Sequence, residues 1–187
     1  MSLVNNCIID NKTFGNVGDF LKETVKDGSE ISIVSAYFTI FAYYSLHNNL
    51  DKIKSLRFLF GEPTFIQNST TDVKNYKIED DTISVSINEK ISQKKIAQKC
   101  AQWLLEKAEI KSIVKPNFLH GKMYYVDLNE KNYPQALCGS SNFTMSGLGL
   151  KKESSNIELN LVVDSDRQKE EIKNWFDAVW NDKTGLG

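Results

Sequence analysis

The sequence alternates short strand-like runs with helical segments, and this alternation restricts the chain to the α/β class. Runs rich in β-branched and aromatic residues predict strands over 30–38, 54–61, 82–87, 118–127, 135–139 and 156–163. Helices are expected over 18–28, 39–50, 88–108 and 164–180. A chain of 187 residues is long enough for one domain with a sizeable core. We therefore predict a single α/β domain, 1–187, built on a mixed β-sheet.

Two of the expected helices show a clear apolar face. In the 88–108 segment, apolar residues recur at helical spacing: Ile96, Cys100, Trp103 and Leu104. The last segment opens with a predicted capping box, Ser165 and Gln168, and then carries an apolar stripe at Ile172, Trp175, Phe176 and Val179. Between residues 61 and 81 the sequence is polar, which indicates a long connection or a lid.

Composition narrows the class of protein further. The sequence shows neither a membrane-spanning apolar run nor the plan of a signal peptide. Its three cysteines are scattered, which suits a reducing cytoplasm and argues against a disulfide framework or a zinc ribbon. The net charge of −1 does not indicate a nucleic-acid binder, although eight lysines gather between residues 90 and 122. A solvated helix face is the simpler interpretation of that cluster, and a basic surface is the alternative.

The second half of the chain holds a set of side chains suited to phosphodiester chemistry. His120 and Lys122 are two residues apart on a predicted strand, so we expect them on the same face. Asn142 and Glu158 follow near the expected ends of later strands. A histidine supplies a nitrogen nucleophile, and lysine and asparagine donate hydrogen bonds where negative charge develops on phosphate oxygens. A carboxylate can hold the imidazole in the reactive tautomer.

Two motifs in this region resemble those of the phospholipase D superfamily. His120, Lys122 and Asp127 form an H-x-K-x4-D motif, and Gly139 and Ser140 open a G-S-x-N motif that ends at Asn142. The resemblance covers the second half of the chain by motif and the whole chain by the plan of its strands and helices. It implies the fold of that superfamily, in which helices flank both faces of the mixed sheet.

The resemblance also implies roles for these residues. His120 would be the nucleophile that forms a phosphohistidine, while Lys122 and Asn142 would bind the phosphate oxygens. Ser140 would shape the same pocket, and Asp127 and Gly139 would be structural members of the motif. Glu158 would orient His120, with Glu153 of the polar 151–155 segment as the rival carboxylate. The resemblance implies neither a metal nor a cofactor.

The chain departs from the family pattern in two ways. Residues 128–138 form a longer interval than usual between the two motifs, which an extended turn can absorb. The family's double displacement also uses two histidines, whereas this chain has one H-x-K motif. Its other histidine, His47, lies on a predicted apolar helix with no lysine two residues on, so we expect it to have no catalytic role. We therefore expect a homodimer that brings two copies of His120 together across a two-fold axis.

Three functions remain as hypotheses. The first is a metal-independent DNA endonuclease of the restriction- or helicase-associated branch, in which 1–187 would be the N-terminal domain of a longer helicase or restriction protein. The second is a phospholipase or phosphatidyltransferase, although the sequence lacks a basic amphipathic anchor. The third is a non-catalytic DNA-recognition and dimerisation module. A metal-dependent nuclease is a weaker rival, based only on the Glu109-Ile110-Lys111 sequence. The sequence does not distinguish DNA from RNA.

Overall fold

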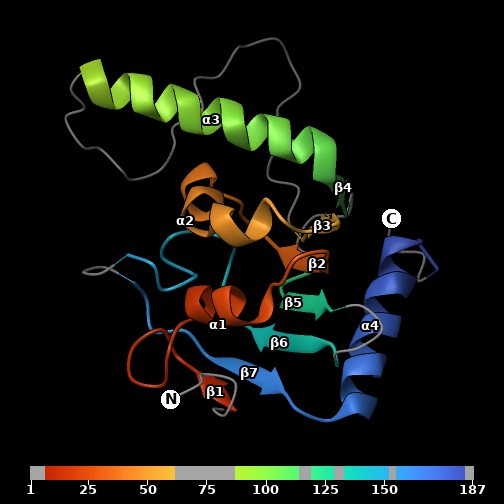
Figure 1. Cartoon of the computed structure of the whole chain (residues 1–187). Coiled ribbons are helices and arrows are strands. Elements are labelled where there is room, and N and C mark those ends of the chain that lie inside the picture. Colours follow the sequence, from red (N-terminus) through yellow and green to blue (C-terminus); the bar gives the residue numbers. More distant parts are fainter. Residues whose placement is uncertain (1–6, 62–86, 114–118, 129–132, 152–154, 184–187) are drawn as a thin grey trace, which may run out of the picture.

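The computed structural model describes residues 7–61, 87–113, 119–128, 133–151 and 155–183. Strands and helices alternate along the chain, as the sequence predicted (Figure 1). In chain order the elements are β1 (Ile8–Ile9), α1 (Val17–Thr24), β2 (Glu30–Ser35), α2 (Ile40–Leu50), β3 (Ser55–Phe60), α3 (Ile87–Lys107), β4 (Ala108–Ser112), β5 (Lys122–Asp127), β6 (Gln135–Gly139), β7 (Asn160–Val163) and α4 (Asp166–Trp180).

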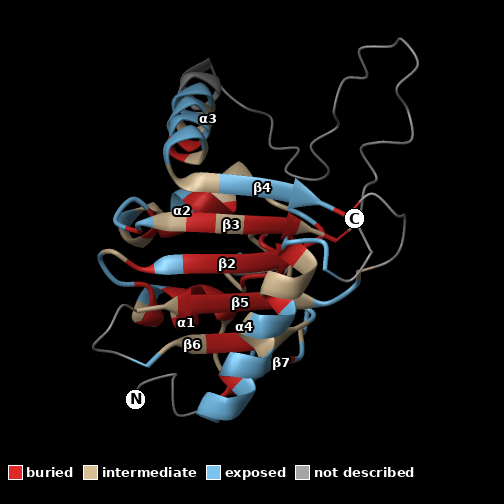
Figure 2. Ribbon diagram, turned by 90° about the vertical axis from the view of Figure 1, so that its right-hand side faces the viewer, coloured by how far each residue is buried: buried red, intermediate tan, exposed pale blue. Residues whose placement is uncertain are grey.

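The described strands form one seven-stranded sheet in the order β1-β7-β6-β5-β2-β3-β4. Figure 2 shows the order from β7 to β4. β2, β3 and β4 run parallel to one another, whereas β5, β6, β7 and β1 pair antiparallel with their neighbours. The sheet is therefore mixed, as predicted. β5 and β2 lie at its centre, so both of their faces are covered and the strands are almost continuously buried.

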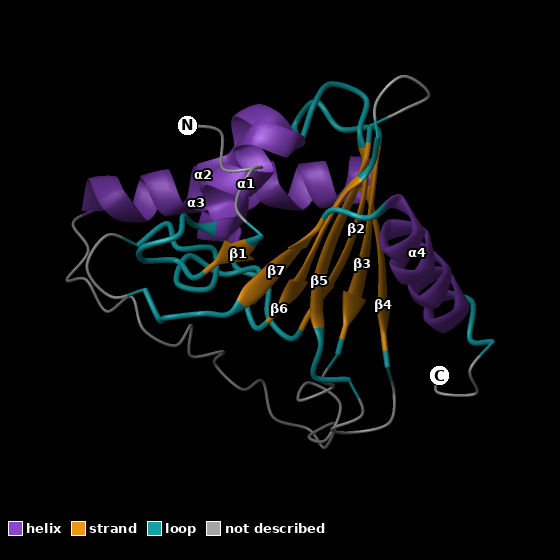
Figure 3. Cartoon of the chain, turned by 90° about the horizontal axis from the view of Figure 1, so that it is seen from below, coloured by secondary structure: helices purple, strands orange, loops and turns teal. Residues whose placement is uncertain are grey.

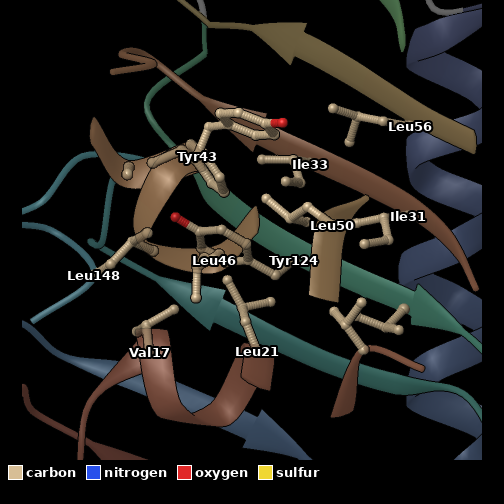
Figure 4. Packing of buried hydrophobic residues seen from close by; sticks show 14 of the residues in the cluster. Val17, Leu21, Ile31, Ile33, Tyr43, Leu46, Leu50, Leu56, Tyr124 and Leu148 are labelled. Atoms are coloured by element: carbon tan, nitrogen blue, oxygen red, sulfur yellow. The ribbon is translucent and has the colours of Figure 1, made fainter. Parts of the chain in front are cut away.

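Helices cover both faces of this sheet (Figure 3). One core lies between the sheet and α1–α3, and its largest buried side chains include Tyr43 and Tyr124 (Figure 4). A second core lies under α4, where Phe176 and Trp180 contact Met123 and other residues of the opposite sheet face. At about 25 cal/mol per Å² of apolar surface removed from water, burial of these side chains is the main force that holds the layers together.

The long helix α3 is attached to the fold by the C-terminal half of its predicted apolar face. Cys100 and Trp103 are buried, and the Trp103 indole donates to the Leu50 carbonyl at 2.9 Å. Lys99 forms an ion pair of 2.7 Å with Asp51. The first turns of α3 reach past the other helices (Figure 1).

Two predicted strands are shorter than expected. The 118–127 strand begins only at Lys122. At this end of β5, Lys122 pairs with Gly139 of β6 and Met123 pairs with Val34 of β2. The described residues before Lys122 pair with neither strand. The 156–163 strand begins at Asn160. Before that point, the Ser140 side chain takes the place of a ladder partner by accepting from Leu159 N–H at 3.0 Å.

Other boundaries also differ from the predictions. β1 and β4 were not predicted, since one has two residues and the other is exposed at nearly every position. Of the predicted 82–87 strand, Ile87 begins α3 and the rest lies outside the described residues, as does the predicted connection from 62 onward. Ser165 occupies the N-cap of α4, but its side chain makes no capping hydrogen bond, so the predicted capping box does not form.

Candidate active site

Most of the predicted site residues meet at one end of the sheet. The register pairs Lys122 with Gly139 and Gly139 with Asn160, so the start of β5, the end of β6 and the start of β7 lie side by side. Because β2 runs antiparallel to β5, its last residue, Ser35, also reaches this end. We call this the motif end of the sheet. It brings together segments that are far apart in the sequence.

Asn142 is fixed at the motif end with a defined orientation. Its Oδ1 accepts from Ala36 N–H at 3.0 Å and lies 3.1 Å from the Ser35 Oγ, which shares its one proton between this oxygen and the Tyr37 carbonyl. A backbone N–H can only donate, so the amide atom that faces Ala36 must be the oxygen. The Asn142 NH₂ group is therefore directed away from β2 as a donor.

Ser35 is a residue of the site that the sequence analysis missed. It is fully buried, and its hydroxyl contacts Asn142, accepts from Phe143 N–H at 2.9 Å and donates to the Tyr37 carbonyl at 2.8 Å. The buried polar position at the end of an apolar strand was the available signal, since a buried hydroxyl needs partners. Its partner lies 107 residues away, which no local pattern reveals.

Ser140 and Glu158 form a second pair at the motif end. The Ser140 hydroxyl donates to the Glu158 carboxylate, and the Ser140 N–H donates to the Leu159 carbonyl at 3.1 Å. Glu158 itself is anchored through its N–H, which donates to the Asp10 carbonyl at 3.1 Å. Its carboxylate thus contacts Ser140, and its expected role in orienting His120 stays a prediction. The rival Glu153 lies outside the described residues.

A buried network supports the G-S-x-N turn from below. Asn160 is fully buried; it donates to the Ser141 hydroxyl at 2.9 Å and accepts from Ser141 N–H at 3.2 Å. The Tyr124 hydroxyl donates to the Ser141 carbonyl at 2.9 Å. Burial, together with the negative charge of Glu158, raises the pKa of Tyr124 well above its usual value, so this phenol remains a donor.

Gly139 has a steric reason to be glycine. A Cβ at this position would lie 2.2 Å from the Leu159 carbonyl oxygen and 2.6 Å from the Asn160 Cα. Backbone atoms cannot give way as a flexible side chain can, so β6 and β7 approach this closely only around a glycine. This contact gives the predicted structural role of Gly139 a physical basis.

Lys122 and His120 lie at the same end of β5. The sequence predicted that both would lie on one face of this strand, but His120 is not part of the strand. His120 precedes the strand and is exposed. The Lys122 ammonium donates to the His120 carbonyl at 2.9 Å, so the two residues are linked through the backbone. Among the described residues no ion pair engages Lys122, and no hydrogen bond involves the His120 ring. Within the described part of the chain, one of the three Lys122 N–H donors is therefore used by a neutral carbonyl, and two have no partner.

Asp127 lies at the other end of β5, opposite Glu30 of β2. At about 3.3 Å per residue, the length of β5 separates it from Lys122 by about 17 Å. Asp127 thus stands away from the other motif residues, and its structural role stays a prediction. The Glu109-Ile110-Lys111 sequence lies on β4, at the edge of the sheet, and not at the motif end.

Several lysines of the 90–122 cluster bond other parts of the fold. Lys107 donates to the Ile53 carbonyl and Lys111 to the Trp180 carbonyl, each at 2.9 Å, and Lys99 is paired with Asp51. Lys94 and Lys95 on α3 are exposed. Within the described residues, these two are the members of the cluster on α3 that remain available for an anion.

An apolar pocket of about 540 Å³ adjoins the motif end on the α4 side. Lys122 and Gly139 contribute to its wall, together with Cys138, Leu161 and Trp175. Burial raises the pKa of the Cys138 thiol to about 11, so this cysteine is an apolar wall group at neutral pH. The neighbouring side chains are unusually exposed for their type: Ile157 78%, Leu159 68% and Leu161 55%.

With this geometry in place, the match to a known family decides the identity of the fold. Residues 17–180, from α1 to the end of α4, match the family described as cardiolipin synthase, PLD-like domain. The chain belongs to this PLD-like family. The predicted fold class and the resemblance drawn from the motifs are thereby confirmed, and the domain falls in the phosphodiesterase superfamily. No curated protein matches the chain.

Solved structures show similarity at low sequence identity. Yeast tyrosyl-DNA phosphodiesterase is 11% identical, with a TM-score of 0.44 over 77% of this chain and 28% of its own. Polyphosphate kinase from Porphyromonas gingivalis is 13% identical, with a TM-score of 0.47 over 90% of this chain and 24% of its own. The archaeal chromatin protein TrmBL2 is 10% identical, with a TM-score of 0.44 over 94% and 51%. The chain thus spans half or less of the length of most of these proteins.

The described residues contain neither a candidate metal site nor a candidate membrane-spanning helix. No group of three or more His, Cys, Asp or Glu side chains there has an arrangement that could hold a metal ion. None of the helices in the described ranges is both long and apolar enough to cross a membrane.

Proposed function

We propose that this domain is a metal-independent phosphodiesterase that cleaves DNA through a phosphohistidine at His120. The observation that carries the proposal is the orientation of Asn142, whose NH₂ group is presented at the same sheet end as the Lys122 ammonium. Two donors of this kind, one neutral and one charged, stabilise the negative charge that builds on non-bridging phosphate oxygens. Membership of the PLD-like family supports the same chemistry.

The reaction would proceed in two displacements. A nitrogen of the His120 imidazole attacks phosphorus, and the bond to the leaving oxygen breaks as a second histidine donates its proton to that oxygen. Water then attacks the phosphohistidine and gives its proton to the second histidine, which restores both rings. Lys122 and Asn142 hold the phosphate oxygens throughout, and Ser140 keeps the turn between them in shape.

The second histidine would come from a second copy of the chain. His47 is a poor alternative, because its ring stacks on Tyr44 at 4.9 Å and its Nδ1 contacts the Tyr44 carbonyl on the outer side of α2. The exposed apolar side chains Ile157, Leu159 and Leu161 border the motif end and supply a surface of the kind that proteins bury on association. Leu161→Glu should therefore shift the protein towards monomer in sedimentation and reduce activity in parallel.

A lipid substrate is the second candidate, and the apolar pocket beside Lys122 favours it. That pocket would accommodate an apolar group attached to the phosphate, as in a phosphatidyl substrate. A dimeric enzyme that hydrolyses phosphatidylglycerol in vesicles but leaves DNA intact would establish this candidate and overturn the DNA proposal. A non-catalytic recognition module would bind DNA and cleave neither substrate.

The decisive assay is cleavage in excess chelator. Plasmid, single-stranded DNA and bis(p-nitrophenyl) phosphate should all be hydrolysed in EDTA, because in this proposal Lys122 and Asn142 take the role that cations have in other nucleases. Activity that disappears with EDTA and returns with magnesium would contradict the mechanism. A mixed dimer of one wild-type and one His120→Ala chain should be inactive; half-activity would contradict the composite site.

A further inference from the structure

Two residues beyond the end of β2, an exposed aromatic residue follows the backbone contact of the proposed phosphate-binding amide. Tyr37 is 50% exposed and follows Ala36, whose N–H is bonded to Asn142 Oδ1. Among the described residues, neither a ring contact nor a side-chain hydrogen bond engages Tyr37. A tyrosine ring of this exposure offers an apolar π-face with a polar edge to a ligand.

The backbone of Tyr37 is anchored to the same hydroxyl as Asn142. The Ser35 Oγ donates to the Tyr37 carbonyl at 2.8 Å and accepts from the Tyr37 N–H at 3.3 Å. The same hydroxyl bonds Asn142 Oδ1 at 3.1 Å. Consecutive Cα atoms are about 3.8 Å apart, so the Cα of Tyr37 lies about that distance from the Cα of Ala36, whose N–H contacts Asn142. The backbone that carries the ring is therefore anchored to the same hydroxyl that contacts Asn142.

Tyr44 provides a contrast on the neighbouring helix α2. Its exposed fraction is similar, 43%, but its ring is stacked on His47 with an interplanar angle of 4°. One face of Tyr44 is thus already covered. Of the two tyrosines, only Tyr37 lies next to the phosphate-binding amide with its ring unoccupied in the described part of the chain.

We infer that Tyr37 stacks on the base of the nucleotide that adjoins the cleaved phosphodiester. Bases within a duplex are covered by their neighbours, so a stacking residue selects substrate whose bases are unpaired. The inference rests on the proposed function and makes it more specific: the preferred substrate is single-stranded nucleic acid. Tyr37 then determines which diesters bind, while Lys122 and Asn142 act on the phosphate itself.

A binding experiment tests this without requiring turnover. Fluorescence anisotropy would compare His120→Ala protein with an added Tyr37→Ala change, using a labelled oligothymidylate and the same strand with abasic positions. Loss of one stacking residue should weaken binding of the base-bearing strand about tenfold. It should leave binding of the abasic strand unchanged, because the ring then has no base to contact.

Two further variants show whether the effect belongs to the ring. Tyr37→Phe should restore binding, since the π-face is retained, and Tyr44→Ala should change little. An equal loss on both strands, or a Tyr37→Phe variant as weak as Tyr37→Ala, would overturn the stacking role. A Tyr37→Ala variant that binds oligonucleotide normally but loses binding to anionic vesicles would also overturn it and assign the ring to a membrane surface.

The result is separable from the test of the proposed function. If the wild-type chain hydrolyses no diester, the phosphodiesterase proposal fails, and the anisotropy comparison still decides the role of Tyr37. If diesters are hydrolysed and Tyr37→Ala binds both strands like its parent, only the stacking inference fails.

Discussion

The two ends of the central sheet contain similar polar side chains but hold them differently. At the motif end, the Lys122 ammonium is held by a backbone carbonyl and Asn142 by a backbone N–H and a serine. At the opposite end, Lys54 pairs with Glu30 at 2.6 Å, and Arg57 pairs with Asp177 at 2.7 Å. Lys54 and Arg57 are therefore neutralised by carboxylates.

Arg57 shows what the opposite end does for the fold. Its guanidinium bonds Asp177 and the Ser32 hydroxyl and lies over the rings of Phe176 and Trp180, at 4.8 and 5.7 Å from their centroids. It thereby attaches α4 to the sheet. The pocket at this end has a volume of about 640 Å³ and is lined by charged side chains of both signs. Its basic side chains do not outnumber its acidic ones, so the pocket is not suited to an anion.

One sheet can thus have one end that stabilises the fold and another end that is available for a substrate. A carboxylate partner fixes a cation and cancels its charge, whereas a neutral carbonyl fixes it and leaves the charge for a substrate. The motif end uses neutral partners for Lys122 and Asn142. Variants at the two ends test this difference.

His120→Ala should abolish hydrolysis of bis(p-nitrophenyl) phosphate while the circular dichroism spectrum and Tm stay unchanged, because the residue is exposed and outside β5. His47→Ala is the matched control and should retain nearly full activity. A folded His47→Ala protein without activity would show that the nucleophile or its partner has been assigned wrongly.

Lys122→Ala should reduce kcat by about 10²–10³, the usual cost of removing one transition-state donor. Lys54→Ala, at the opposite end, removes an exposed pair and should leave kcat within a factor of two or so. If Lys122→Ala raised KM alone, Lys122 would bind the substrate without stabilising the transition state, and the contrast between the two ends would weaken.

Ser35→Ala should lower kcat about tenfold, because loss of one buried hydrogen bond allows the Asn142 amide to turn. Ser32→Ala is the control on the same strand: it is also buried but contacts Arg57. Ser32→Ala should lower the unfolding temperature slightly and leave kcat unchanged. Equal kcat values for the two variants would show that Ser35 does not position Asn142 for catalysis.

Asp177→Asn should affect stability and not kcat. Burial raises the pKa of Asp177, but hydrogen bonds from Lys173 and Arg57 outweigh it and lower the pKa below 3.8. A carboxyl whose pKa is depressed in the folded state stabilises above its unfolded pKa, and this contribution is lost as the pH falls through the folded value. Denaturant unfolding should show a deficit of about 1–3 kcal/mol for Asp177→Asn at pH 7. The deficit should shrink below about pH 4; a constant deficit would contradict the charge-based explanation.

The sequence predicted the central sheet well because its strands obey simple patterns. The cores of the 30–38 and 118–127 segments are buried on both faces and rich in apolar residues, which single-sequence patterns detect. β4 escaped detection because its residues are mostly exposed and show no alternation. β1 is too short to form any pattern.

The site was predictable as a set of residues but not as an arrangement. The motifs identified Lys122, Ser140 and Asn142, and the register brings them to one end. Where the strand begins depends on Gly139 and Val34, partners that lie far from His120 in sequence, so the strand face assigned to His120 was wrong. Ser35 was missed for the same reason, since its contact with Asn142 exists only in the folded chain.

The most direct test of the account is detection of the covalent intermediate. Wild-type protein would be mixed with substrate in excess EDTA, quenched in alkali, where a phosphoramidate bond survives, and analysed by mass spectrometry of its peptides. We expect a phosphoryl-linked adduct on the peptide that contains His120, and we expect none in His120→Ala protein. An adduct on Ser140, or steady product formation with no adduct on any histidine, would contradict it.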